Sequence, residues 1–187
     1  GTLLDKSVKF EKEELDLYKK IIVKMMEVES IDQMCLKYKF QGIFSFYMTA
    51  FGEYGAIVGS AAACQPQDTI FSQYREFSSL YWRGFTLQEL MDNLLGNCKD
   101  IIKGRQMPIH FSDKRVNFFS VSSPLATNIS QAAGFGFGLA QKKEPAICLN
   151  YFGEGAASEG DFYAGLNFAA TLKTQTMFFC RNNGYAI

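Results

Sequence analysis

The feature that most constrains the fold is an alternation of strand and helix signals in the second half of the chain. Residues 146–152 form a short apolar run typical of a buried strand, residues 160–172 have helical spacing, and residues 176–180 are fully apolar. A small-residue helix is predicted at 130–141 and another buried strand at 117–121. Two consecutive β-α-β units with short connections imply a parallel sheet with helices on both faces, so the predicted fold class is α/β.

The first part of the chain is predicted to be helical. Residues 11–39 carry charged and apolar side chains at helical spacing, which fits one long helix or two short ones. We therefore expect an N-terminal helical segment at 1–39. A ligand-binding domain is expected at 40–187, and its C-terminal side is expected to be truncated in this sequence.

The segment that joins these halves has weaker signals. A small-residue helix is expected around residues 60–64, and a short apolar strand at 68–74. Thr86 followed by Glu89 resembles a capping box, which predicts that a helix begins there and runs to about residue 95.

Composition restricts the class of protein. With 187 residues and 48% hydrophobic residues, the chain suits one globular domain of ordinary size. Basic and acidic residues balance at 19 each, so neither nucleic acid nor an anionic membrane is an expected partner. The sequence lacks a membrane-spanning run and a signal-peptide pattern, so any targeting segment is expected to be already absent. Its five cysteines are widely spaced, which predicts reduced core thiols in a reducing compartment.

An acidic residue lies within a glycine turn that follows the strand at 146–152. Gly153 and Gly155 allow a sharp turn with close backbone approach to phosphates, and amides near Ala156 begin the next helix. Glu154 would repel a bound phosphate charge by about 4 kcal/mol at 4 Å with an effective dielectric constant near 20. A Mg²⁺ ion between them would remove that repulsion. The alternative is a plain glycine turn with a solvated acid.

A second polar element follows the next strand. Arg181 and the pair Asn182-Asn183 end the apolar run, and an Asn side-chain oxygen is a hard ligand that suits Mg²⁺. Neighbouring parallel strands end at the same edge of a sheet, so this element can lie beside Glu154. Asn-Asn-Gly also favours a tight turn without any ligand. The two elements together are much more specific than either alone.

This combination resembles the diphosphate and magnesium motif of thiamine diphosphate enzymes, which normally reads Gly-Asp-Gly and then Asn-Asn. The wider strings GEGAASEGDFYAGLNFAATL and FFCRNNGYAI resemble the alpha subunits of branched-chain 2-oxo acid dehydrogenases. The resemblance extends from about residue 40 to the end of the sequence, and it implies the thiamine diphosphate-binding fold. It implies a magnesium site and a diphosphate site. The magnesium ligands would be Glu154, Asn183 and the backbone carbonyl of Tyr185, and the diphosphate contacts would be Gly155, Ala156 and Arg181.

Other segments match the same family. Tyr74 and Arg75, in QYRE, correspond to residues that reach the diphosphate, although an ion pair of Arg75 with Glu76 or another surface acid is the alternative. Ser123 and Leu125 correspond to residues that contact and support the cofactor. The same loop would bind K⁺ through Ser122, Pro124, Thr127 and Asn128. Asn128 replaces a Gln of relatives, so that site departs from the family pattern.

The only histidine lies in a predicted loop, residues 104–111. His110 has no acid or nucleophile near it in sequence, which favours a structural or supporting role over catalysis. The catalytic alpha-subunit histidine of the family falls beyond Ile187, so the resemblance implies no catalytic residue within this sequence.

The resemblance implies oxidative decarboxylation of branched-chain 2-oxo acids in the mitochondrial matrix, with thiamine diphosphate, Mg²⁺ and K⁺ as cofactors. A beta subunit would complete a heterotetramer of two alpha and two beta chains, and the acyl group would pass to the lipoyl group of an acyltransferase core. Two alternatives remain open: an alpha subunit of pyruvate dehydrogenase, and a non-catalytic scaffold chain with the same fold.

Overall fold

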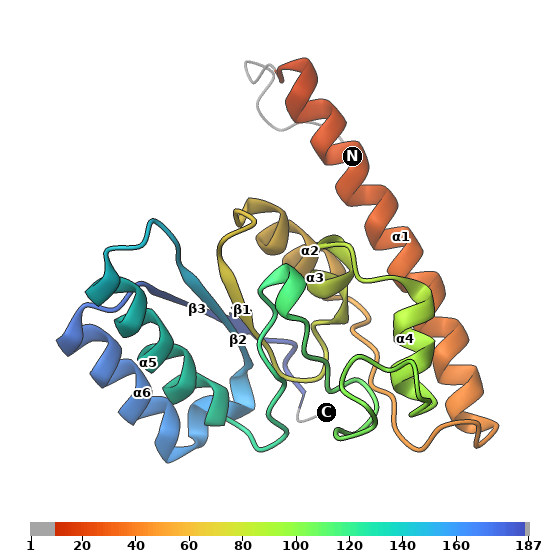
Figure 1. Cartoon of the computed structure of the whole chain (residues 1–187). Coiled ribbons are helices and arrows are strands. Elements are labelled where there is room, and N and C mark those ends of the chain that lie inside the picture. The colour runs from red at the N-terminus through yellow and green to blue at the C-terminus, as the bar shows by residue number, and fades with distance from the viewer. Residues whose placement is uncertain (1–9, 186–187) are drawn as a thin grey trace.

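Residues 12–40 form one long helix. The structure is a computed structural model, and it describes residues 10–185. Helix α1, Lys12–Phe40, begins at Glu11, whose backbone amide donates to the Glu14 carboxylate at 2.9 Å. Its first half buries no side chain and projects beyond the body of the molecule (Figure 1). Its second half packs against the rest of the chain through four buried side chains: Val28, Ile31, Asp32 and Cys35.

Three parallel strands form the sheet, in the order β1-β2-β3. The strands are β1 (Thr69–Phe71), β2 (Cys148–Gly153) and β3 (Thr176–Arg181). The last paired residues of β2 and β3 are Gly153 and Arg181, so both strands end at the same edge. This register brings the two polar elements of the sequence side by side.

Helices cover both faces of the sheet. The helices other than α1 are α2 (Tyr54–Ala63), α3 (Phe77–Trp82), α4 (Leu87–Leu94), α5 (Thr127–Lys142) and α6 (Gly160–Leu172). Leu149 and Tyr151 of β2 join the core formed with α1 to α4, whereas Phe152 packs toward α5 and α6. Figure 1 shows α5 and α6 side by side at one flank of the sheet. Side chains that alternate along β2 therefore pack into hydrophobic clusters on both faces of the sheet. The predicted α/β class is confirmed.

Two glycines allow α5 to approach its neighbours closely. A Cβ at Gly165 of α6 would lie 2.8 Å from Ile129 Cγ2 and 3.1 Å from the Ser130 nitrogen of α5. A Cβ at Gly136 of α5 would collide with Thr176 Oγ1 at the start of β3. The contacts with Ile129 Cγ2 and Thr176 Oγ1 would both be shorter than a Cβ atom tolerates, so the packing of α5 against α6 and β3 requires glycine at these two positions.

Several predicted elements differ from the structure. The strand expected at 117–121 is wrong, because Asn117 adopts a left-handed conformation and Phe118 forms only isolated bridges with Ile70 and Asp113. The strand expected at 68–74 is only three residues long, and the helix expected around 60–64 begins earlier, at Tyr54. Helix α3 was not predicted. The Thr86–Glu89 capping box is confirmed, with the Glu89 amide 3.2 Å from Thr86 Oγ1.

The division into 1–39 and 40–187 remains a prediction, and residues 1–9 and 186–187 lie outside the described part of the chain. The cysteines only partly agree with the expectation of core thiols. All are free, but Cys98 and Cys180 are exposed. Burial raises the pKa of the Cys35 thiol to about 11, which keeps it protonated near neutral pH.

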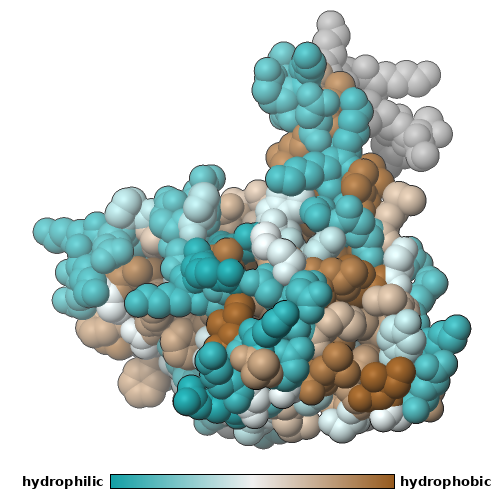
Figure 2. Space-filling view, turned by 45° about the vertical axis from the view of Figure 1, so that its right-hand side comes forward, coloured by the Kyte–Doolittle hydropathy of each residue, from teal (hydrophilic) through white to brown (hydrophobic). Residues whose placement is uncertain are grey.

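The surface mixes polar and apolar side chains. Figure 2 shows the projecting part of α1 as mostly hydrophilic with hydrophobic side chains among the polar ones. Its exposed apolar residues include Leu15, Tyr18, Ile22 and Met26. Across residues 10–185, none of the helices combines the length and apolar character needed to span a membrane.

Candidate cofactor site

One cavity collects most of the predicted site residues. It lies at the carboxyl ends of β2 and β3, where ligands bind in open parallel sheets, and has a volume of about 60 Å³. The predicted residues that line it are Tyr74, Arg75, Leu125, Glu154, Gly155, Ala156, Arg181, Asn183 and Tyr185. A larger hollow of about 380 Å³ adjoins it and shares Arg75, Asn183 and Tyr185. The chain therefore brings the acidic turn and the Asn-Asn turn into one place, as the strand order predicts.

The acidic turn forms a short 3-10 helix, η2, Glu154–Ser158, directly after β2. The first amides of such a helix have no partner within it, and Gly155 and Ala156 occupy those positions. Gly155 is exposed, so a ligand can reach its backbone. Glu154 is half-buried and lines the same cavity as these amides.

Arg181 is held between two acids. Its Nη1 donates to Glu53 Oε2 at 2.5 Å, and its Nε pairs with Glu76, whose carboxylate is fully buried. Burial by itself lowers the pKa of Arg181, but Glu76 and Glu53 outweigh it and raise that pKa above its ordinary value. Arg181 is therefore a permanently charged group whose guanidinium plane is fixed from two sides.

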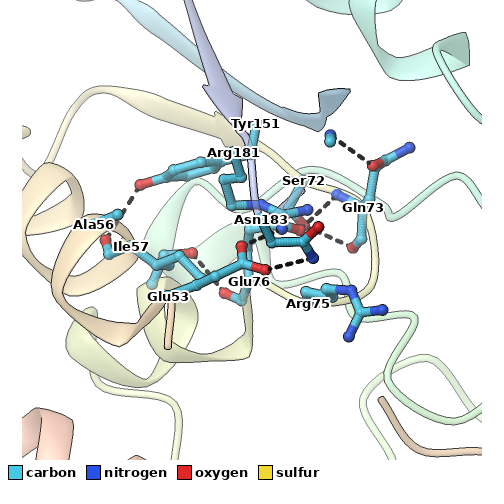
Figure 3. A network of polar contacts seen from close by, with 12 residues as sticks. Glu53, Ala56, Ile57, Ser72, Gln73, Arg75, Glu76, Tyr151, Arg181 and Asn183 are labelled. Atoms are coloured by element: carbon cyan, nitrogen blue, oxygen red, sulfur yellow. Dashed lines mark hydrogen bonds and ion pairs between the residues drawn. The ribbon is translucent and has the colours of Figure 1, made fainter. Parts of the chain in front are cut away.

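Asn183 has one contact at each end of its amide. Nδ2 donates to Glu53 Oε1 at 3.2 Å, and Oδ1 accepts from the backbone amide of Tyr185 at 2.8 Å. The second contact is the Asx turn expected of Asn-Asn-Gly, so the turn and the candidate site coincide. Figure 3 shows Glu53, Glu76, Arg181 and Asn183 converging from separate elements.

Among residues 10–185, Arg75 forms an ion pair neither with Glu76 nor with another acid, so the alternative of a plain ion pair is wrong. Its Nη1 donates to the Thr49 carbonyl at 2.6 Å, while Glu76 pairs with Arg181. The next residue, Ala50, donates its amide to the buried carboxylate of Asp32 at 2.8 Å. Helix α1 thus fixes the loop that holds Arg75 at the cavity.

Gln73 is a buried residue of the cavity that was not among the predicted site residues. Its Oε1 accepts from the Gly153 amide at 3.2 Å, which ties the acidic turn to the end of β1. Its Nε2 is buried and has no hydrogen-bond acceptor among the described residues. An unpartnered buried donor in a cavity is costly unless a ligand satisfies it, so Gln73 adds a donor suited to an anion.

His110, expected to have a structural or supporting role, contacts one of the predicted site residues. It is buried, its Nδ1 lies 3.0 Å from the Pro108 carbonyl, and its Nε2 contacts Ser123 Oγ. Because a carbonyl only accepts, Nδ1 carries the proton in this arrangement and Ser123 donates to Nε2. Ser123, predicted to contact the cofactor, is thus oriented by a histidine close to the ring of Tyr74.

The loop proposed for potassium contains an unpartnered oxygen. Asn128 Nδ2 donates to the Tyr151 carbonyl at 2.7 Å, but Asn128 Oδ1 is buried without a donor among the described residues. Ser122 and Thr127 are half-buried and Pro124 is exposed. Oxygen atoms of this kind are ligands for hard cations.

Three residues that contact the predicted site residues were not themselves predicted as site residues. The residues overlooked in the sequence are Gln73, Glu76 and Glu53. Gln73 and Glu76 belong to the QYRE string that directed attention to Tyr74 and Arg75, so a signal existed. Glu53 precedes Arg181 by 128 residues, and nothing local to it indicates the contact.

Comparison with known proteins gives one consistent result. The model of the family described as "Dehydrogenase E1 component" matches residues 23–187. The chain is 49% identical over 191 residues to the mitochondrial 2-oxoisovalerate dehydrogenase subunit alpha of Caenorhabditis elegans, covering 100% of this chain and 43% of that protein. The protein of the same name from Dictyostelium discoideum is 46% identical over 183 residues, which are 98% of this chain and 41% of that protein.

The corresponding human protein is 47% identical over 173 residues, covering 92% of this chain and 38% of that protein. The chain thus spans about two fifths of the length of the curated relatives it matches. These matches confirm the resemblance to alpha subunits noted in the sequence. The chain belongs to the dehydrogenase E1 component family, which is thiamine diphosphate-dependent.

Proposed function

We propose that the chain forms the cofactor-binding part of the alpha subunit of a branched-chain 2-oxo acid dehydrogenase. The observation that carries the proposal is that Glu154 and Asn183, from adjacent strand ends, line one cavity with Arg75 and Arg181. The reaction would be oxidative decarboxylation of branched-chain 2-oxo acids, with transfer of the acyl group to a lipoyl group. When bound, thiamine diphosphate supplies the nucleophile and the electron sink for that reaction.

The charges of the site support a cofactor with a divalent cation. Glu53, Glu76 and Glu154 provide three carboxylates near the two guanidinium groups. A diphosphate alone would meet an excess of negative charge, whereas Mg²⁺ would neutralise it. Glu154, Asn183 Oδ1 and the Tyr185 carbonyl would hold the ion. In residues 10–185 no three His, Cys, Asp or Glu side chains form a metal cluster, so an amide and a carbonyl must complete the set.

The remaining residues have positions that suit the diphosphate. Arg75 and Arg181 would bind its oxygens through charged donors, and the backbone amides of Gly155 and Ala156 would add neutral ones. Tyr74 would contact the cofactor and Leu125 would support it, both from the lining of the cavity. Ser123 is not part of that lining and would contact the cofactor from its place beside His110. Leu125 is 41% exposed, and covering an apolar side chain at a site edge favours binding of an apolar part of a ligand.

Potassium is proposed at the loop that precedes α5, through Ser122, Pro124, Thr127 and Asn128. The unpartnered Asn128 Oδ1 supports this assignment, because a buried acceptor without a donor is stabilised by a cation. Replacement of K⁺ by Na⁺ in the buffer is expected to weaken cofactor binding.

We also propose a beta subunit as partner, in a heterotetramer of two alpha and two beta chains that serves a lipoyl acyltransferase core. Tyr185 at the cavity is 75% exposed, so one side of the site is open to a second chain. The mitochondrial matrix is the proposed location, in agreement with the names of the relatives.

Calorimetric titration of the assembled protein with Mg²⁺ and thiamine diphosphate tests the site. Glu154→Ala and Asn183→Ala are each expected to weaken Mg²⁺-dependent cofactor binding at least tenfold, because each removes one hard oxygen from the ion. Equal binding by the wild type and both variants would overturn the assignment. Turnover of 3-methyl-2-oxobutanoate against pyruvate tests the substrate, and a strong preference for pyruvate would contradict the branched-chain proposal.

A further inference from the structure

Glu53 contacts two candidate site residues at once. It occupies the N-cap position of α2 without a side-chain capping bond, and its side chain is 11% exposed. One carboxylate oxygen accepts from Arg181 and the other accepts from Asn183 Nδ2 at 3.2 Å. It therefore connects the end of β3 with the turn that follows, from an element far away in the sequence (Figure 3).

The contact with Asn183 sets which end of the amide faces Glu53. An amide presents a donor at Nδ2 and an acceptor at Oδ1, and only the oxygen can bind a hard cation. A carboxylate can only accept, so Glu53 attracts Nδ2 and turns Oδ1 away from itself. The Tyr185 amide favours the same orientation, but it belongs to the same turn as Asn183, whereas Glu53 holds the amide from a separate helix.

The second contact of Glu53 holds Arg181 at the end of β3. Glu76 lies at the opposite side of the guanidinium, and both acids raise the pKa of Arg181 against the effect of burial. Glu76 itself is anchored, since its carboxylate accepts a hydrogen bond from the backbone amide of Gln73 at 2.8 Å. Glu53 is the part of this pair that also reaches the Asn-Asn turn.

We propose that Glu53 is a positioning residue that fixes the Asn183 amide with its oxygen toward the magnesium position while it holds Arg181 at the same edge. The inference rests on the proposed magnesium and diphosphate site and assigns it a support that no local motif reveals. Glu53 is not among the residues that line the smaller cavity with Glu154, Asn183 and Tyr185, so its assigned role is to hold Asn183 and Arg181 rather than to bind the ion.

The experiment uses the alpha chain assembled with its beta subunit and measures Mg²⁺ affinity at saturating thiamine diphosphate by calorimetry. Mn²⁺ binding by electron paramagnetic resonance gives a second readout that is independent of turnover. Glu53→Gln keeps the size of the side chain but offers Asn183 an NH₂ group, which favours the inverted amide. The expected result is a loss of cation affinity of about tenfold or more, as is usual when a supporting partner of a metal ligand is changed. The exposed Glu144→Gln serves as matched control and is expected to bind as the wild type does.

A second substitution distinguishes orientation from general damage. Asn183→Asp presents oxygen at both ends, so in the double variant Glu53→Gln, Asn183→Asp the new amide nitrogen at position 53 can donate to one oxygen while the other faces the ion. Cation affinity is expected to recover in the double variant. Asn183→Asp alone is expected to bind poorly, because its carboxylate would face that of Glu53. Unchanged affinity in Glu53→Gln, or a double variant as weak as the single one, would overturn the positioning role.

Failure of the underlying site would look different. If Asn183→Ala and Glu154→Ala both retain wild-type Mg²⁺ affinity, the magnesium site itself is wrong. If those two variants lose the ion and Glu53→Gln keeps it, only the role of Glu53 is wrong. Should Glu53→Gln not assemble, Glu53→Asp, whose shorter side chain cannot reach both partners, is measured in its place with the same expected loss and the same overturning result.

Discussion

Asp32 shows how a single buried residue supports the site from a distance. Its carboxylate accepts from Tyr47 Oη at 2.6 Å, from Tyr54 Oη at 2.7 Å and from the Ala50 amide at 2.8 Å. These contacts bind α1 to the loop whose Thr49 carbonyl holds Arg75. Burial is the largest influence on the carboxyl and raises the pKa of Asp32 above its usual 3.8, against the hydrogen bonds that lower it.

The raised pKa of Asp32 predicts how the effect of an Asp32 substitution on stability changes with pH. An acid whose pKa is raised on folding contributes most to stability below its unfolded pKa, and that contribution is lost as the pH rises toward the folded pKa. Asp32→Asn removes this dependence but leaves at least one donor without an acceptor, at a cost of about 1–3 kcal/mol. The destabilisation relative to wild type is therefore expected to shrink as the pH rises from about 4 toward 7.

Urea unfolding of both proteins across that range measures the difference in the free energy of unfolding. Asp16→Asn, on the exposed first half of the same helix, is the control and is expected to change stability by less than about 0.5 kcal/mol. A penalty for Asp32→Asn that grows with pH would contradict the raised pKa.

Among single residues, the sequence predicted those whose role is indicated by their immediate neighbours in the chain. Glu154 lies in a glycine turn and Asn183 in an Asn-Asn pair, each directly after an apolar strand, so their shared location followed from the parallel strand order. Asp32 and Glu53 could not be predicted in the same way, because each acquires its role only from partners in other elements. A carboxylate in a helical pattern is usually solvated, and only the folded chain distinguishes these two.

Among the elements, α5 and its neighbours depend on glycine at particular positions. Gly136 and Gly138 are both in α5, but a Cβ at Gly136 would collide with Thr176 Oγ1 and lie 3.1 Å from the Gln175 carbonyl carbon, whereas Gly138 has open space within 4 Å. The same helix thus contains a glycine required by packing and one that packing within the chain does not require.

We expect opposite effects from the two alanine substitutions. Gly136→Ala would push α5 away from β3 and lower the free energy of unfolding by about 1–3 kcal/mol, the usual cost of overpacking. Gly138→Ala would raise it by up to about 1 kcal/mol, because alanine favours helix more than glycine does. Thermal or urea unfolding of the two variants checks this, and equal destabilisation by both would show that close packing is not the reason for Gly136.

The predicted helices and strands were correct where one pattern of apolar residues continues without interruption, and wrong where the backbone turns within such a pattern. Helix α6 and strand β3 have uninterrupted patterns, and their predicted bounds agree closely with Gly160–Leu172 and Thr176–Arg181. The apolar run at 117–121 resembles a strand, but the left-handed Asn117 interrupts it after a 3-10 turn at Lys114–Val116. Periodicity alone does not reveal such a conformation, since Asn tolerates it without any change in the apolar pattern.

In the whole molecule, the site is assembled from segments distributed over most of the chain. Contributions come from the start of α2, the segment after β1, the loop before α5 and the ends of β2 and β3. The parallel sheet order is what the sequence could predict of this assembly. Which loop lies opposite the strand ends depends on α1 to α4, whose arrangement follows from core packing rather than from any motif.

The balance of charge at the site predicts linked binding. Three carboxylates face two guanidinium groups, so Mg²⁺ and thiamine diphosphate should each bind weakly alone and at least tenfold more tightly together, with the same factor in both directions. Titration of the assembled protein with the cofactor in EDTA and in excess Mg²⁺ measures the factor. Cofactor affinity that is the same in both buffers would contradict the link.

Such a balance also protects the site from the wrong anions. Inorganic phosphate, free nucleotides and organic acids are abundant in cells, and a pocket with surplus arginine would be occupied by them much of the time. Because Glu53 and Glu76 already engage Arg181 from two sides, a bare anion finds little uncompensated positive charge there. In the proposed site, stable occupancy would therefore require Mg²⁺ together with the anion, so the ion would exclude bare anions before any contact with the organic part of the cofactor is made.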